Sequence, residues 1–498
     1  MRITNKIIQN NSINNINVNK ELQDSLSTMI ASRKKIARPS EDPIIALRSL
    51  RLRTSVNQTT QYVEKNVQDA NSWLKVTEDA ITTLSDVIVD IRKLYVKGTQ
   101  DTLTASDRKI ITDNLESLAA EIYNTGNVDF AGRSVFTGFR TDSTLVFQKD
   151  ETVNYRIDED FDSVRVDETT FINTDDDELK VYTKNLTRIR LSYNKLAGGD
   201  GDAGKLPTGS ITVNGQNIDI SSNLVVRKLA DEPYKYVSET AKNSIVYVPE
   251  TGELLIGEEV GVPDGNGGTI LANKETIENV RVSYTKDTWD KGDLRPEHYF
   301  ACQDRTDSSH VIDYTSPAKE GQIEYNIGVN QSIRINTTAD ECFSHNIVRD
   351  LQDVMNALSE VNEIEEKIAT IEKEIKGYDE TQTTEIEAAK ARLESAKKSQ
   401  TFINEKLHSL FSNCITFADK YLEDNNVALT NCGTRSKRLD LIENRLDTQL
   451  STLKELKSEN EDADIAETAI RLKSAEYAYD AALMSTAKII KESLLNYV

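Results

Sequence analysis

An apolar pattern with helical spacing runs through residues 435–498 without a proline. Apolar residues three or four positions apart form one face of an amphipathic helix, and such a face packs against a partner. In the first half of the stretch these residues are Leu439, Ile442, Leu446, Leu450, Leu453 and Leu456. The stretch therefore predicts a long helix with one buried face, which the rest of the fold has to cover.

After an acidic break at residues 459–467, the pattern carries two apolar stripes instead of one. The first stripe consists of Ile465, Leu472, Tyr479, Leu483, Ile490 and Leu494. The second stripe lies roughly 130° away at 100° per residue and consists of Ile470, Tyr477, Met484 and Leu495. Because one neighbouring helix cannot cover both stripes, we expect burial against other molecules. A helix buried inside an ordinary bundle is the alternative.

Charge and hydropathy restrict the possible partners. The 498 residues include 60 Lys and Arg against 82 Asp and Glu, a formal net charge of −22. Such a chain is repelled by phosphate backbones and anionic membranes, so we expect no nucleic-acid binding. No stretch approaches the roughly 18 apolar residues of a membrane span, and the first residues lack the apolar core of a signal peptide. We therefore expect no membrane insertion, and any export would proceed without a cleaved signal peptide.

The amino-terminal part of the sequence divides into a sparse segment and a helical one. Residues 1–40 are rich in Asn, and their few apolar residues, among them Ile3 and Ile7, cannot form a core without a partner. Ser40 or Asp42 can cap a helix that has Pro43 in its first turn, and helical spacing continues to Gly98. Thr104 with Asp107 three residues later resembles a capping box and predicts the next helix.

Residues 148–342 have a different texture, with short alternating runs broken by turn residues. Two alternating runs flank Asn214-Gly215, the strongest short hairpin signal, and two more flank residues 250–252. A further alternating pair covers residues 323–336. This part of the chain therefore predicts a β-rich domain inserted between helical segments.

Helical spacing returns near Phe343, and residues 356–400 read as a charged, heptad-like helical hairpin that turns near Gly377. The expected fold is mainly α with an inserted β-rich domain. We expect an assembly segment at 1–40, helical halves at 41–147 and 343–464, the insertion at 148–342 and an assembly helix at 465–498.

The sequence contains only incomplete motifs for binding nucleotides or metal ions. Residues 199–205 resemble a phosphate-binding loop, but Leu206 and Pro207 follow where a hydroxyl residue and a helix are needed. Asp264, Asn266 and Glu275 have the outer spacing of a calcium loop, but glycine is missing from its sixth position. Four possible zinc ligands are Cys302, His310, Cys342 and His345, for which buried thiols and surface histidines are the alternative. We expect no cofactor, no metal and no catalytic site.

Two further cysteines, Cys414 and Cys432, are 18 residues apart. On one continuous helix they would lie roughly 27 Å from each other, whereas a disulfide needs about 7 Å or less between the Cα atoms. A bond between them would require the helix to break at Asn425-Asn426.

Several short strings resemble the flagellin superfamily in their order and in their distance from the two ends. They are residues 1–5, 38–43, 130–142, 434–439, 462–467 and 493–495. The resemblance covers roughly both outer thirds of the chain and is closer, over residues 130–147, to the members that join hook and filament than to filament flagellin.

The resemblance implies a structural role and a set of partners. The amino- and carboxy-terminal segments would pair as a long antiparallel helical bundle or coiled coil. The chain would bind an export chaperone and would be secreted to the flagellum. There it would self-associate in a ring next to flagellin and another hook-associated protein. A filament subunit is the alternative within this class. A secreted adhesin or enzyme, with its activity in the β-rich insertion, is the alternative outside it.

Overall fold

The computed structural model describes residues 5–100, 103–162, 165–173, 181–199, 203–263, 268–315, 321–379 and 382–495. The chain forms two compact units, each described by itself. The terminal unit consists of Met1–Ala70, Asn326–Ile333 and Lys437–Val498. The central unit consists of Asn71–Tyr325 and Arg334–Ser436.

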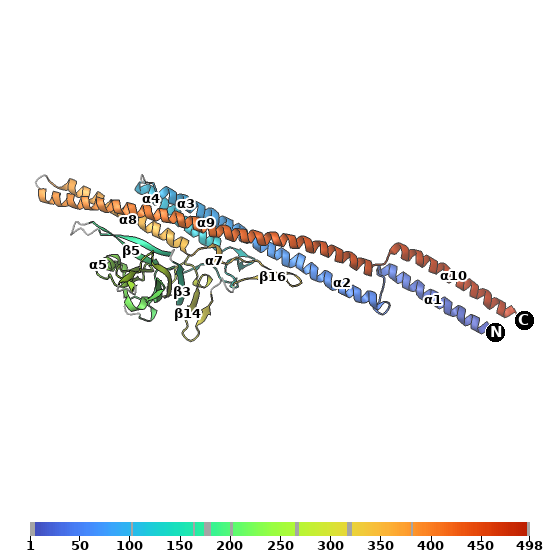
Figure 1. The fold of residues 1–498 in the computed structure, drawn as a ribbon. Coiled ribbons are helices and arrows are strands. Elements are labelled where there is room, and N and C mark those ends of the chain that lie inside the picture. Colours follow the sequence, from blue (N-terminus) through green and yellow to red (C-terminus); the bar gives the residue numbers. More distant parts are fainter. Residues whose placement is uncertain are drawn as a thin grey trace. The chain divides into compact units, whose positions relative to one another are not determined.

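The terminal unit is built from helices of both chain ends. Helix α1 (Asn5–Ser32) lies antiparallel beside α10 (Ile465–Leu495), and α2 (Pro43–Gln61) runs beside the end of α9 (Thr383–Glu461) (Figure 1). Asp42 caps α2, because its carboxylate accepts hydrogen bonds from the backbone N–H groups of Ile44 and Ile45. A π-helical segment, Tyr62–Val67, separates α2 from α3 (Gln68–Gly98). The sequence pattern did not predict this π-helical segment.

A hydrogen bond of 2.7 Å from Gln68 Nε2 to Glu443 Oε1 shows which residues of α9 lie opposite the amino-terminal helices. Since the helices are antiparallel, Leu446 lies one turn further on, against the segment that ends at Gln68. It is 4% exposed.

Replacing Leu446 with Ala should therefore lower the free energy of unfolding by about 2–5 kcal/mol, because buried apolar surface is lost and a cavity remains. Urea denaturation of the full chain measures this. Leu456 lies on the same helix but is 45% exposed, so Leu456→Ala is the control and should cost far less. Equal stabilities of the two variants would contradict the packing.

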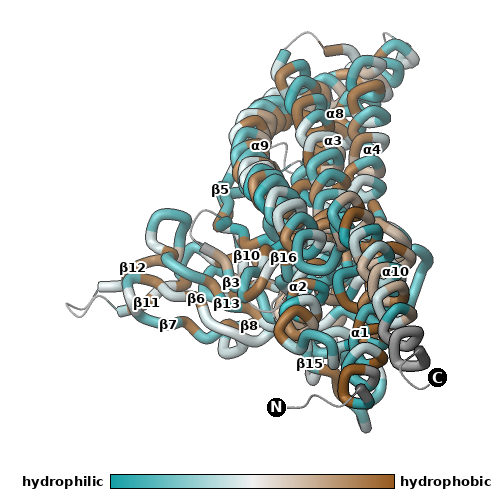
Figure 2. The backbone as a smooth tube through the Cα atoms, turned by 90° about the vertical axis from the view of Figure 1, so that its right-hand side faces the viewer, coloured by the Kyte–Doolittle hydropathy of each residue, from teal (hydrophilic) through white to brown (hydrophobic). Residues whose placement is uncertain are grey.

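The helical part of the central unit consists of α3, α4 (Ala105–Gly126), α8 (Asn346–Gly377) and the first part of α9. The predicted capping box is confirmed, because Thr104 and Asp107 bond each other's backbone N–H groups at the start of α4. Hydrophobic and hydrophilic residues alternate along α3, α8 and α9, as expected of packed amphipathic helices (Figure 2). Helices α8 and α9 form an antiparallel hairpin, bridged by ion pairs such as Lys406–Glu360.

Two larger sheets lie in the central unit. The first has the order β4-β5-β10-β9-β8 and the second the order β15-β14-β3-β13-β6-β7. Helix α5 (Pro233–Glu239) packs on the first sheet around a core that includes Leu186, Val237 and Leu255. The predicted hairpin at Asn214-Gly215 joins β6 to β7, and both turn residues have positive φ angles.

The strands have the following bounds. In the two larger sheets they are β3 (Tyr155–Asp162), β4 (Val166–Ile172), β5 (Thr183–Arg190), β6 (Thr208–Val213), β7 (Gln216–Asp219), β8 (Leu224–Val226), β9 (Ile245–Val248), β10 (Glu253–Ile256), β13 (Ile277–Lys286), β14 (Ala301–Asp304) and β15 (Ile312–Tyr314). Three short pairs are β1 (Asp129–Phe130) with β2 (Arg133–Ser134), β11 (Gly261–Pro263) with β12 (Thr269–Leu271), and β16 (Glu324–Gly328) with β17 (Gln331–Arg334). The short helix α7 (Ala339–Cys342) precedes α8. The predicted fold class, mainly α with an inserted β-rich region, is confirmed.

Candidate functional site: an apolar surface on the terminal helices

Three residues of the second stripe of α10 are exposed in the terminal unit. Ile470, Tyr477 and Met484 are spaced seven residues apart, so they lie on one helix face, and they are 69%, 73% and 70% exposed. Of the first stripe, Leu472 and Tyr479 are half-buried, whereas Ile465 and Leu483 are exposed. Ile490, Leu494 and Leu495 lie on α10, but their side chains are outside the described part of the structure, as is the whole of Ile3.

The pairing of α1 with α10 leaves much apolar surface open on α1 as well. Exposed apolar side chains on α1 are Ile7, Ile13, Val18 and Leu22. Among the described side chains of the two helices, those that are buried are Leu26, Thr468, Ala475 and Thr486. So few buried groups give a thin interface, which leaves exposed apolar side chains on both helices for contact with other proteins.

Helix α2 adds a further exposed apolar row. Ile44, Leu47 and Leu50 recur every three residues and are 72%, 53% and 61% exposed. We did not single out these residues from the sequence, although their spacing is helical. With the second stripe of α10, they give the terminal unit two exposed apolar faces.

An acidic clasp holds the chain where α9 gives way to α10. Glu461 is 4% exposed and accepts hydrogen bonds from Arg53 Nε at 2.6 Å, from Lys34 Nζ at 3.2 Å and from Ser49 Oγ. Lys34 also pairs with Asp462 at 2.6 Å. The hydrogen bonds from Arg53, with those from Ser49 and Lys34, lower the pKa of Glu461 to about 2. The clasp thus ties the start of α2 and the segment before it to the end of α9.

Removing the charge of Glu461 should destabilise the terminal unit. Ordinary glutamate has a pKa of 4.5, so the ionised clasp contributes fully above that pH, and its contribution is lost as the pH falls towards 2. Its charged partners, Lys34 and Arg53, are half-exposed, so we expect Glu461→Gln to cost about 1–3 kcal/mol at pH 7, between the values for exposed and buried pairs. Urea denaturation at pH 7 and near pH 2.5 measures this, and the difference from the parent should shrink at the lower pH.

The matched control is Glu467→Gln on α10, since Glu467 pairs only with the exposed Arg471 among the contacts that the structure records for it. It should change the stability by less than about 1 kcal/mol. If Glu461→Gln were as harmless as this control, the clasp would not stabilise the fold.

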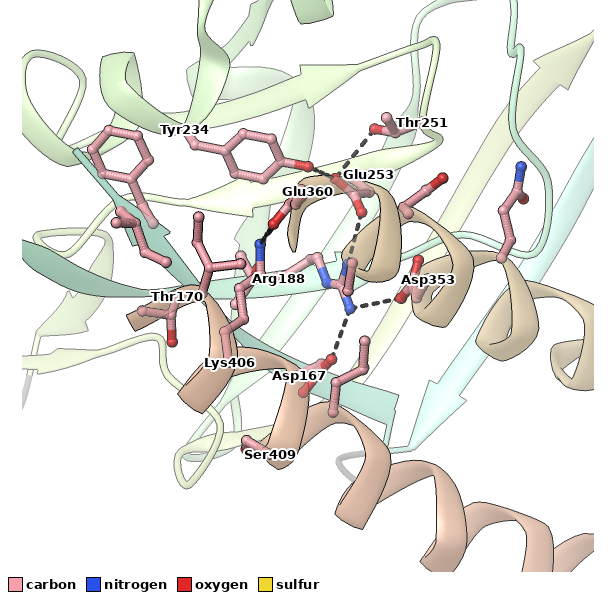
Figure 3. A pocket seen from close by; sticks show the side chains of 18 of the residues that line it. Asp167, Thr170, Arg188, Tyr234, Thr251, Glu253, Asp353, Glu360, Lys406 and Ser409 are labelled. Carbon is pink, nitrogen blue, oxygen red and sulfur yellow. Dashed lines mark hydrogen bonds and ion pairs between the residues drawn. The ribbon is translucent and has the colours of Figure 1, made fainter. Parts of the chain in front are cut away.

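A buried charged network joins the first sheet of the central unit to α8 (Figure 3). Arg188, 9% exposed, contacts Asp167 at 2.8 Å, Glu253 at 2.9 Å and Asp353 at 3.0 Å. Arg190 follows two residues later on the same face of β5 and contacts Asp353 at 2.7 Å. Burial alone would raise the pKa of Asp353, but the nearby arginines outweigh it and hold this pKa well below its usual range. The network therefore stays charged at neutral pH.

The metal and cofactor candidates do not come together as sites. Within the described residues, no three His, Cys, Asp or Glu side chains gather where a metal ion could be held, so Cys302, His310, Cys342 and His345 form no ligand set. Asp264 and Asn266 of the calcium spacing, and residues 200–202 of the phosphate-loop string, lie outside the described residues. Among the helices that the structure describes, none has the length and hydropathy needed to cross a membrane.

All four cysteines are free and buried. Helix α9 is continuous through Asn425 and Asn426, so Cys414 and Cys432 cannot form a disulfide, as predicted. Burial raises the pKa of all four thiols, that of Cys432 to about 11.

Comparison with known proteins places the amino-terminal part of the chain. Residues 3–141 match the model of the bacterial flagellin N-terminal helical region. A flagellin from Clostridium tyrobutyricum is 28% identical over 127 residues, 26% of this chain and 33% of the relative. Flagellar hook-associated protein 3 of Salmonella typhimurium is 23% identical over 144 residues, 29% of this chain and 45% of the relative. The protein of the same name from Escherichia coli is 25% identical over 111 residues, 22% of this chain and 35% of the relative.

These matches span less than half the length of each curated relative. Among solved structures, the flagellar junction protein FlgL from Legionella pneumophila aligns over 83% of this chain and 99% of that one. The identity is 11% and the TM-score 0.29. The expected resemblance to the flagellin superfamily is confirmed for the amino-terminal part of the chain, where residues 3–141 match the bacterial flagellin N-terminal helical region.

Proposed function

We propose that this chain is a structural subunit of the bacterial flagellum that forms the junction between hook and filament. The observation that carries the proposal is the exposed second stripe of α10 in a chain whose amino-terminal region is of the flagellin type. Two of the curated relatives are hook-associated protein 3, in support of the junction rather than the filament. We infer no catalytic activity.

The proposed partners follow from the same surface. Copies of the chain associate in a ring through α1 and α10, and this ring contacts flagellin on one side and another hook-associated protein on the other. Before assembly, an export chaperone covers the apolar stripes, and the chain is secreted without a cleaved signal peptide. The proposed assembly interface comprises Ile3, Ile7, Leu472, Tyr479, Leu483, Ile490 and Leu494 together with the second stripe.

Filament flagellin is the second candidate, supported by the relative from Clostridium tyrobutyricum. A filament flagellin and a junction protein differ in how many copies each flagellum contains and in where those copies lie. A junction protein occupies one short zone of each flagellum, whereas a flagellin occupies the whole filament.

Electron microscopy of a strain without this chain tests the proposal. We expect hooks without filaments and flagellin released into the medium, and a plasmid-borne copy should restore the filaments. Immunogold labelling of the restored strain should mark one zone next to the hook. Labelling along the filament would favour flagellin instead, and intact filaments in the deletion strain would contradict both candidates.

A further inference from the structure

Strand β4 has a free edge. It stands first in its five-stranded sheet, and among the described residues its only strand partner is β5. In an antiparallel pair, alternate residues direct their backbone N–H and C=O groups away from the partner strand. Such an edge accepts a further strand unless something covers it.

A cavity of about 510 Å³ lies along this edge. Six consecutive residues of β4, 167–172, line it. A cavity over a sheet face would be lined by every second residue, because successive side chains of a strand point to opposite faces. The unbroken run therefore indicates that the cavity includes the edge of β4 as well as part of the adjoining sheet face.

Helices α8 and α9 form two further walls of this cavity, and Arg188 of β5, Tyr234 of α5 and Glu253 of β10 line it at the end nearer the sheet. From α8 come residues that recur every three or four positions, among them Asp353, Ala357, Glu360, Ile364 and Lys367. From α9 come Ile403, Lys406 and Ser409 at the same spacing. Figure 3 shows Lys406 and Ser409 on α9 and Thr170 on β4 around the same space. We call the space between β4, α8 and α9 the edge-strand groove.

The dimensions of the edge-strand groove suit an extended chain. Helix α8 rises about 21 Å from Asp353 to Lys367 at 1.5 Å per residue, and six strand residues span roughly 20 Å. The volume lies within the usual range of about 300–1,000 Å³ for ligand sites. A segment of about six residues in strand conformation therefore matches the length of the groove.

The walls are fixed before anything binds. The ion pair between Lys406 and Glu360, at 2.8 Å, joins α8 to α9, and the network of Arg188 joins β4 to α8 through Asp167 and Asp353. A groove with fixed walls spends little binding free energy on ordering itself.

The charges of the groove indicate what it would accept. Among the described residues, seven carboxylates line it against four basic side chains. Four of these carboxylates already pair with Arg188 or Lys406, and the lining keeps a formal excess of three negative charges. Apolar side chains, including Phe171, Ile172, Ile364 and Ile403, lie between them. Basic and aliphatic side chains complement such walls.

We propose that the edge-strand groove binds an extended peptide segment of a partner protein, in which basic and aliphatic residues alternate, as an added strand on β4. Backbone hydrogen bonds to the strand supply affinity, and the charges of the groove select the sequence. The site does not depend on the role of the chain in the flagellum.

The test uses the full chain and a capped heptapeptide in which valine and lysine alternate. Fluorescence anisotropy should report binding, and hydrogen exchange of the β4 amides should slow when the peptide is present. Two control peptides carry N-methyl groups on alternate residues, one at the odd positions and the other at the even positions. In only one of them are the methylated N–H groups those that would donate to β4. That peptide loses backbone hydrogen bonds and should bind at least about tenfold more weakly than the other.

A pair of substitutions on α9 locates the site. Ser409→Trp places a large side chain in the groove and should abolish binding, whereas Ser412→Trp, also exposed but outside the groove, should leave it unchanged. Circular dichroism verifies that both variants fold. Equal binding of both N-methylated peptides, protection of the β8 edge instead of β4, or no binding of the parent peptide would each overturn the proposal.

Discussion

A chain in which Ile470, Tyr477 and Met484 are all replaced by Ser is expected to fold as the parent does and yet to be missing from flagella. These side chains are about 70% exposed, so the monomer loses little buried apolar surface. The melting temperature should stay within a few degrees of the parent value. In the assembled flagellum, burial of each side chain should contribute about 1.5–3 kcal/mol to the free energy of association. Thermal unfolding of the purified variant and immunoblots of sheared flagella measure the two effects.

Removal of residues 470–498 should have the same two consequences. The control for both variants is Val427→Ser, which changes an exposed apolar residue of α9 in the central unit and should permit incorporation. A large loss of melting temperature in the triple variant would show that the second stripe stabilises the monomer instead of the assembly.

The second large effect is expected from Asp353→Ala in the buried network. Its carboxylate contacts both Arg188 and Arg190, so its loss leaves two buried cations with fewer partners. Breaking a buried pair in this way costs about 3–5 kcal/mol. Urea denaturation of the full chain, followed by fluorescence from Trp289 and Trp73, measures the loss.

Asp419→Ala serves as the matched control. Asp419 pairs with Arg92, but its side chain is 52% exposed, and exposed pairs contribute about 0–1 kcal/mol. If the two aspartates were equally dispensable, the network would contribute no more to stability than a surface ion pair.

The parts of the fold that the sequence predicted are those with local signals. The capping box of Thr104 and Asp107 depends on residues three positions apart, and the hairpin at Asn214-Gly215 depends on two residues that tolerate positive φ angles. The second stripe of α10 depends on helical periodicity alone. Each of these signals lies within one element, so a single sequence contains all of the information.

The parts that the sequence did not predict depend on residues far apart in the chain. Arg188 and Asp353 are 165 residues apart, and no spacing rule connects them. Glu461 belonged to what we interpreted as an acidic break, because its partners Ser49 and Arg53 lie about four hundred residues earlier. The free edge of β4 depends on the strand order of a sheet, which local patterns do not specify.

Because the native thiols are buried, the chain can be labelled at an introduced cysteine while its own cysteines stay unlabelled. Maleimides react with thiolates, and burial keeps Cys302, Cys342, Cys414 and Cys432 protonated and covered. A cysteine introduced at the exposed Ser474 of α10 would therefore react selectively, without removal of any native cysteine. A fluorophore at that position would report, in living cells, when and where the helix loses contact with water.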